Sequence, residues 1–232
     1  MTGEVHHSHR DVSGGWLRAS VFGAMDGLVS NFALIAGVVG GGATTETVVL
    51  AGLAGVGAGA FSMAAGEYVS VRSQNELAEQ EVAKERHELE RRPEAELAEL
   101  TQMYVDRGVE PRLARQVAEQ MSADREAAVQ LHAMLELGVD PQQLASPFTA
   151  ALSSFGSFLV GALLPLLPYL LGAQTLWPAV LVAAVGLFSA GALVSRVTAR
   201  AWWFSGLRQL LFGMVAAGLT WGIGRLVGVT LG

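Results

Sequence analysis

The most constraining feature of this sequence is a set of long apolar stretches that carry almost no charge. Four of them have roughly 20 residues or more, the length that an α-helix needs to cross a bilayer; they lie at 19–42, 148–172, 177–195 and 207–231. A fifth, at 47–71, is richer in glycine and alanine. Lipid offers no hydrogen-bond partners to loops or sheet edges, so spanning segments of this kind are helical. The sequence therefore predicts an all-α, multi-pass membrane protein with five transmembrane helices.

Charge is concentrated between the second and third apolar stretches. Of the 21 acidic residues, 16 lie between Glu76 and Asp140, together with 8 of the 15 basic residues. Apolar residues recur at helical spacing among these charges, which favours helices over a disordered acidic tail. We therefore expect three parts: a leader with spans one and two at 1–75, an acidic metal-binding helical insertion at 76–146, and spans three to five at 147–232.

Proline and glycine predict three helices in the insertion. Pro93 ends the cytoplasmic extension of span two and starts a second helix, Glu94 to about Arg107, which stops at Gly108. A third helical region opens at Pro111 and reaches Leu137, where Gly138 is the stop signal. Three such helices can form a small bundle.

Arginine placement predicts the orientation, because positive residues beside short loops stay in the cytoplasm. Arg10 and Arg18 precede the first span, whereas the loop 41–47 has no Lys or Arg. The link between spans four and five is flanked by Arg196 and Arg208, and the loop 171–178 has neither residue type. We expect the N-terminus and the acidic insertion to be cytoplasmic.

Several classes of chemistry find no support. Cysteine is absent, which removes disulfides, thiolate metal sites and cysteine nucleophiles. We expect no cleavable signal peptide, because the first apolar run follows a polar leader and is too long for a signal h-region. The leader carries His6, His7 and His9, and we interpret it as a disordered tail rather than a metal site. No catalytic triad, phosphate-binding glycine loop or basic nucleic-acid patch is evident. We therefore expect neither an enzyme nor a nucleic-acid-binding protein.

Asp26 is the most informative single residue, because it lies inside the first span. Ionisable groups in spans usually face a bundle interior or an aqueous cavity and mark an ion or proton path. The alternative is a structural carboxylate bonded to a neighbouring helix. Met63 and Glu67 lie four residues apart on span two, so a thioether and a second carboxylate could face the same pore. Methionine alone usually means packing.

The insertion offers a second possible metal site. Its candidate ligands are paired at helical spacing: Glu85 with Glu88, Glu96 with Glu99, and His132 with Glu136. A turn at Pro93 could bring these pairs together. Carboxylates with imidazole suit Mn²⁺, Fe²⁺ or Zn²⁺, and carboxylates alone also suit Ca²⁺ or Mg²⁺. The alternative is that these glutamates are simply solvated faces of amphipathic helices.

Two long motifs resemble the vacuolar iron transporter family: 26–32, DGLVSNF, and 62–70, SMAAGEYVS. The resemblance extends through the insertion, the segment YVDRG at 104–108 and the run GIGRL at 222–226. It implies a homodimeric, proton-coupled exporter that moves Fe²⁺, and in some members Mn²⁺, from the cytosol into a vacuole or out of the cell.

The resemblance also implies roles for single residues. Asp26 and Met63 fall at the family's pore-lining metal positions. The carboxylates of its cytoplasmic metal-binding domain correspond to Glu85, Glu88, Glu96, Glu99 and Glu136. The chain departs from the family at His132 and Ala133, which stand where a methionine pair is common, so its metal preference is open at this site.

The resulting hypothesis is an exporter in which the insertion captures Fe²⁺ and passes it to a pore at a dimer axis. Protons would then weaken metal binding at the pore residues and so release the ion. The transported ion could also be Mn²⁺, Zn²⁺ or Co²⁺, and no prosthetic group is expected. The alternatives are a channel or Mn²⁺ carrier on the same scaffold, and a membrane-anchored metal buffer or sensor. With 14 arginines to one lysine, the sequence suggests a GC-rich genome and favours a bacterial cell membrane over a vacuolar membrane.

Overall fold

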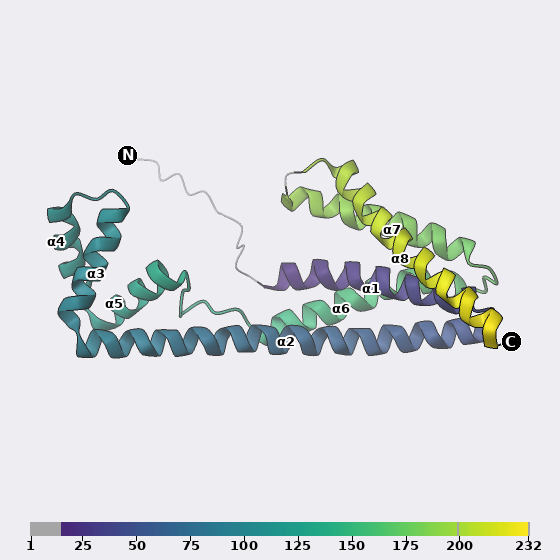
Figure 1. Ribbon diagram of the computed structural model, residues 1–232, viewed down its shortest axis with the longest axis horizontal. Coiled ribbons are helices and arrows are strands. Elements are labelled where there is room, and N and C mark those ends of the chain that lie inside the picture. The colour runs from purple at the N-terminus through teal and green to yellow at the C-terminus, as the bar shows by residue number, and fades with distance from the viewer. Residues whose placement is uncertain (1–14, 199, 232) are drawn as a thin grey trace, which may run out of the picture. The chain divides into compact units, whose positions relative to one another are not determined.

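The computed structural model describes residues 15–198 and 200–231, and these form helices joined by short loops (Figure 1). In chain order the elements are α1 (Trp16–Gly40), α2 (Thr45–Arg91), α3 (Pro93–Asp106), α4 (Pro111–Met121), α5 (Arg125–His132), the π-helical turn η1 (Ala133–Leu137), α6 (Pro147–Leu170), α7 (Trp177–Thr198) and α8 (Trp202–Leu231). His6, His7 and His9 lie outside the described residues.

Five of these helices are long and apolar enough to cross a membrane, which confirms the predicted number of spans. The spanning segments belong to α1, α2, α6, α7 and α8. Large apolar side chains point outward from them; Phe61 on α2, Leu152 on α6 and Leu181 on α7 are each at least 66% exposed. Water does not tolerate so much exposed apolar surface, whereas hydrocarbon does.

The chain divides into two compact units. The first holds the described residues up to Val69 together with those from Pro147 onward, and the second holds 70–146. The first unit contains the five spanning segments. The second contains the polar end of α2 and all of α3, α4, α5 and η1.

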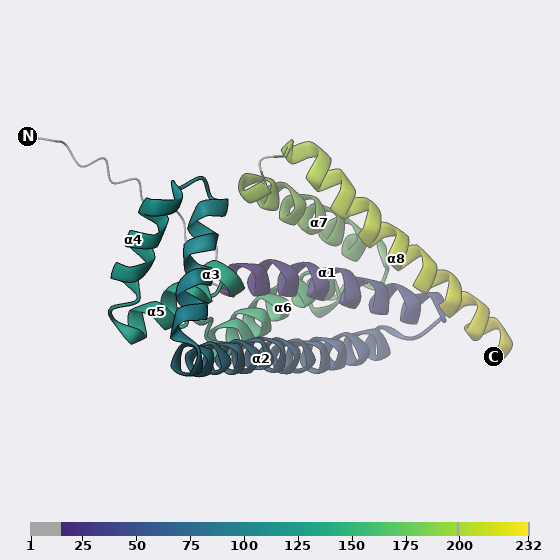
Figure 2. The same ribbon diagram turned by 60° about the vertical axis from the view of Figure 1, so that its left-hand side comes forward.

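In the first unit, α1 and α6 lie side by side and touch through their backbones (Figure 2). A Cβ atom placed on Gly161 of α6 would collide with the carbonyl oxygen of Ala24, and one placed on Gly27 of α1 would collide with the carbonyl oxygen of Phe158. Small residues of this kind let membrane helices approach closely. The core beside this contact includes Ile35, Leu166 and Val56, one from each of α1, α6 and α2.

This contact gives a matched pair of variants on α6. We expect Gly161→Ala to destabilise the protein by several kcal/mol, because the new methyl group meets rigid backbone that cannot move aside. At Gly156 an added Cβ has no described atom within 4 Å, so Gly156→Ala should be neutral or slightly stabilising. Thermal melting of the detergent-purified variants measures both effects, and equal losses would contradict the close contact.

The second unit begins its helices where the sequence predicts. Pro93 and Pro111 each occupy the first turn of a helix, α3 and α4. Gly108 and Gly138 have φ of +92° and +65°, the left-handed conformation that glycine adopts at helix ends. Leu100, Ala118 and Val129 are buried between the helices.

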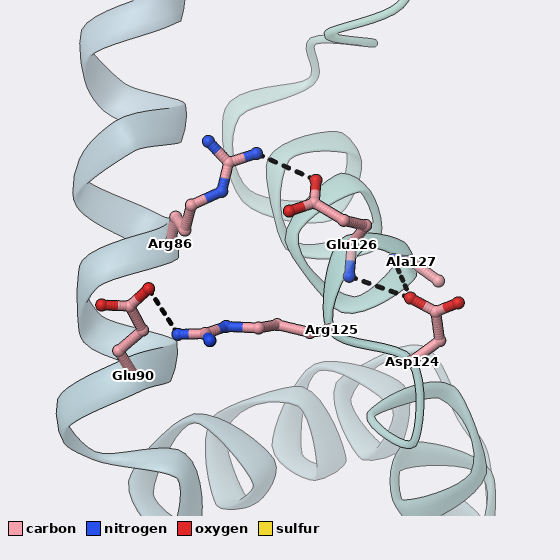
Figure 3. Close-up of polar contacts among 6 residues, drawn as sticks. All are labelled: Arg86, Glu90, Asp124, Arg125, Glu126 and Ala127. Atoms are coloured by element: carbon pink, nitrogen blue, oxygen red, sulfur yellow. Dashed lines mark hydrogen bonds and ion pairs between the residues drawn. The ribbon is translucent and has the colours of Figure 1, made fainter.

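The third predicted helix of the insertion differs from the structure, because it is broken at 122–124. Asp124 caps a new helix, α5: its Oδ1 accepts hydrogen bonds from the backbone N–H groups of Glu126 and Ala127 (Figure 3). Aspartate at this position satisfies amides that would otherwise lack a partner. Two ion pairs then fasten α5 to α2, Arg86–Glu126 at 2.9 Å and Arg125–Glu90 at 2.5 Å. The break turns α5 back onto α2.

Candidate metal sites

The structure brings Asp26 and Met63 together at one cavity within the membrane unit. The cavity has a volume of about 260 Å³ and is lined by side chains from α1, α2 and α6. Asp26 contributes a half-buried carboxylate from α1, and Met63 contributes a half-buried thioether from α2. Phe158 of α6 forms part of its apolar wall. A hard oxygen and a soft sulfur facing one space are a donor set for a transition metal rather than for Mg²⁺ or Ca²⁺.

Glu67 is not among the residues that line this cavity. It is buried, and its carboxylate accepts hydrogen bonds from Nη2 of Arg18 at 2.9 and 3.3 Å. The Arg18 side chain is 66% exposed, whereas the Glu67 side chain is 8% exposed. Arg18 therefore balances the charge of Glu67 and ties α1 to α2. The sequence indicated Arg18 only as a marker of orientation, since a partner 49 residues away leaves no local signal.

The insertion gathers four of its six candidate ligands into one cluster, which consists of Glu85, Glu96, His132 and Glu136. Their ligand atoms all lie within 4.8 Å of one another. The centre is Nδ1 of His132, which is 2.9 Å from Oε1 of Glu85, 3.2 Å from Oε1 of Glu136 and 3.7 Å from Oε2 of Glu96. Neighbouring ligands around an octahedral transition metal with bonds of about 2.1 Å lie about 3 Å apart. The cluster therefore has the spacing of a coordination shell.

Three different elements hold this cluster in place. Glu85 comes from the polar end of α2, Glu96 from α3, and His132 with Glu136 from α5 and η1. His132 is fully buried, with its Nδ1 toward the carboxylates. Nδ1 lies within hydrogen-bond distance of Oε1 of Glu136 and donates to it when it carries the proton, whereas an Nδ1 that binds a metal carries none. Nε2 is buried and makes no hydrogen bond to the described residues.

Glu88 and Glu99 lie outside the cluster. Glu88 is 3.7 Å from Arg92 and its side chain is 42% exposed, and Glu99 is exposed. Two side chains that are three residues apart on a helix point in directions that differ by about 60°. When one member of each predicted pair points inward, the other therefore lies toward the rim.

The cluster is electrostatically strained without a cation. Burial, followed by the negative charges of Glu136, Glu96 and Glu99, raises the pKa of Glu85 to about 7. Burial and Glu99 also raise the pKa of Glu96, partly offset by His132. Carboxylates held together in this way favour proton uptake until a metal ion neutralises them.

The raised pKa of Glu85 predicts how metal-free protein responds to pH. Between about 4.5 and about 7 the folded state binds more protons than the unfolded state, so stability falls as the pH rises through this window. Thermal melting followed by circular dichroism in the presence of a chelator should show this decline. The variant Glu85→Gln should flatten it, and an unchanged slope in that variant would assign the decline to other groups.

Comparisons with known proteins agree on one family. The model of the VIT family matches residues 17–225. A protein of Acanthamoeba castellanii called vacuolar iron transporter is 40% identical, with the match covering 97% of this chain and 84% of that protein. Vacuolar iron transporter 1 of Oryza sativa is 30% identical over 96% of this chain and 90% of its own length. Vacuolar iron transporter 1 of Arabidopsis thaliana is 34% identical over 72% and 67%.

Proposed function

The chain belongs to the VIT family, and from this membership we propose that it exports Fe²⁺, and also Mn²⁺, from the cytosol in exchange for protons. Membership of this family means that the chain is an integral membrane protein that transports metal. The direction, the proton coupling and the roles of single residues are our proposal. The observation that carries it is the cavity shared by Asp26 and Met63, because it places a carboxylate and a thioether together among spanning helices.

The cluster in the insertion supports a capture step on the cytosolic side. Three carboxylates and one imidazole at coordination spacing give a high local negative charge that attracts divalent cations. In this proposal Glu85, Glu96, His132 and Glu136 bind the metal directly, while Glu88 and Glu99 at the rim add negative charge. With imidazole as the nitrogen ligand, the cluster also accepts Zn²⁺ and Co²⁺.

The positions of arginine support a cytoplasmic N-terminus and a cytoplasmic insertion. Metal captured by the insertion would then leave the cytosol through the spans. The named relatives come from eukaryotes, and their names refer to a vacuole. The arginine-rich composition of this chain favours a bacterial cell membrane. Export from the cytosol is the same process in both membranes.

A second copy of this chain is the partner that we propose for α2. Gly52, Gly55 and Gly59 of this helix face neighbouring side chains within the same protein. Gly57, by contrast, has open space where a Cβ would lie, and Phe61, four residues further along the same face of α2, is 71% exposed. Small residues on an exposed helix face favour close association of membrane helices. A dimer formed here would place two copies of Met63 on neighbouring helices.

Transport by purified protein in liposomes tests the proposal. We expect Fe²⁺ and Mn²⁺ to accumulate against their gradients when a pH gradient is imposed, and the gradient to dissipate in step with metal uptake. Zn²⁺ and Co²⁺ should be assayed in parallel. Metal flux that only follows its own gradient would instead favour a channel, and metal binding without flux would favour a buffer or sensor.

A further inference from the structure

A basic pocket lies between α7 and α8, beside the link that joins them. The two helices pack against each other; the spanning segment of α7 ends at Arg196, and that of α8 begins at Trp202. The pocket has a volume of about 750 Å³, and its lining includes Arg196, Arg200 and Trp202. None of the described residues of α2 lines it, so the dimer proposed through α2 would leave this pocket accessible.

The positive charge of this pocket is not balanced by acidic side chains. Arg196 and Arg200 are exposed, and neither forms an ion pair with another of the described residues. The segment 147–232 contains four arginines and no Asp or Glu. The described acidic residues of the membrane unit all belong to α1 and α2, and none of them lines the pocket. The pocket therefore attracts anions.

The start of α8 adds hydrogen-bond donors to the same pocket. The first helical bond of α8 runs from the N–H of Ser205 to the carbonyl oxygen of Ala201 at 3.2 Å. The N–H groups of Trp202, Trp203 and Phe204 precede it, so they have no acceptor within the helix. Ala201 has no side-chain oxygen that could cap them. Because Ala201 and Trp202 line the pocket, this helix end borders it with a partial positive charge.

The remaining lining is largely apolar, which indicates that the anion carries hydrocarbon. Phe188 and Leu193 of α7 both line the pocket, and Leu193 is 59% exposed. The rings of Phe188 and Trp202 meet edge to face with their centroids 5.9 Å apart, which holds the indole of Trp202 against α7. Arginine and tryptophan at the ends of spans lie at the depth of lipid headgroups. A free phosphate ion would use only the polar part of this pocket.

We propose that this pocket binds an anionic phospholipid, with the phosphate at Arg196, Arg200 and the first turn of α8 and an acyl chain along Phe188 and Leu193. A guanidinium group pairs with two phosphate oxygens at once, which gives such a site its geometry. In the proposed orientation the link between α7 and α8 is cytoplasmic, and the cytoplasmic leaflet is rich in anionic lipids. The bound lipid fastens the ends of the two helices to the headgroup layer.

Native mass spectrometry of the delipidated, full-length protein in detergent tests the choice of ligand. We expect phosphatidylglycerol to bind about tenfold more tightly than phosphatidylcholine, which has the same phosphate but no net charge. Bound phosphatidylglycerol should also raise the melting temperature, because it stabilises only the folded state. Inorganic phosphate at the same concentration should leave the melting temperature unchanged, since it has no acyl chain.

Single variants separate a defined pocket from the general positive charge of this face. Arg196→Gln and Arg200→Gln should each weaken the binding of phosphatidylglycerol by about fivefold or more. Arg208→Gln is the matched control, because Arg208 is an exposed arginine of α8 that does not line the pocket; affinity should change by no more than about twofold. Ser189→Phe keeps every charge but fills part of the pocket, so it should weaken binding about as much as Arg196→Gln.

Each outcome decides the assignment. Equal losses in Arg196→Gln and Arg208→Gln, or an unchanged affinity in Ser189→Phe, would overturn the pocket in favour of a diffuse surface charge. Equal binding of the two lipids, or equal stabilisation by inorganic phosphate, would overturn the anionic lipid as its ligand. Melting temperatures of the lipid-free variants report on folding, and if a glutamine variant does not fold, Ser189→Phe and the two lipids still decide. Metal flux is not measured in this test, so it stands apart from the proposed function.

Discussion

Replacing Asp26 by asparagine will lower Fe²⁺ transport by about 100-fold or more. Changes in residues that only support metal ligands already cost about 10- to 100-fold, and Asp26 is the one carboxylate among the residues that line the cavity. The substitution keeps the size of the side chain and removes its charge. Stopped-flow uptake into liposomes that contain a metal-sensitive dye measures the loss, mainly as a fall in kcat/KM.

The control for Asp26→Asn is the same chemical change made in the insertion. Asp140 accepts a backbone hydrogen bond from Gln142 and is not part of the metal cluster. Asp140→Asn should transport metal at the normal rate. Both variants should still bind metal at the cluster in 70–146 with the affinity of the unmodified protein, because that cluster is intact in each. Normal flux in Asp26→Asn would remove the proposed route through the cavity.

Removing two inward carboxylates of the insertion will abolish tight metal binding there. We expect the double variant Glu85→Gln and Glu96→Gln to bind Mn²⁺ and Co²⁺ about 100-fold more weakly, because two anionic ligands around His132 become neutral. Isothermal titration calorimetry of the full-length protein measures the affinity. In the chelated protein the same change should raise the melting temperature, since it relieves the repulsion that raises the pKa of Glu85.

A control with the same change of charge is available within the same two helices. Glu88→Gln with Glu99→Gln removes two negative charges from the rim, so affinity should fall by no more than about threefold, through the weaker long-range field. Equal losses in the two double variants would mean that the insertion attracts metal by net charge rather than by a defined set of ligands.

Regular features of the fold could be predicted from the sequence because their causes are local. A charge-free run of the right length defines a span, and Pro93, Pro111, Gly108 and Gly138 mark helix ends through their backbone geometry. The break at 122–124 also has a local cause, the cap formed by Asp124. The regular apolar spacing on both sides of it masked that signal.

The contents of the sites were harder to predict, because they depend on which helices pack together. The pairing of Glu67 with Arg18 joins residues that are 49 positions apart, so spacing along α2 placed Glu67 with Met63 instead. Helical spacing likewise could not separate Glu85 from Glu88. Asn31, whose amide donates to the carbonyl oxygen of Ala162 on α6, did have a signal: it is a polar residue in an apolar span, five residues beyond Asp26 and inside the motif at 26–32.

The backbone contact between α1 and α6 limits how the cavity lined by Asp26 and Met63 can open. Gly161 against Ala24, Gly27 against Phe158, and the amide of Asn31 bonded to Ala162 leave these two helices no room to slide or separate without breaking several contacts at once. They form a stationary wall. The remaining wall of the cavity is α2, which carries Met63. In the proposed transport cycle, we therefore expect the gate that admits or releases the ion to be a displacement of α2, in which the thioether of Met63 moves while the carboxylate of Asp26 stays in place.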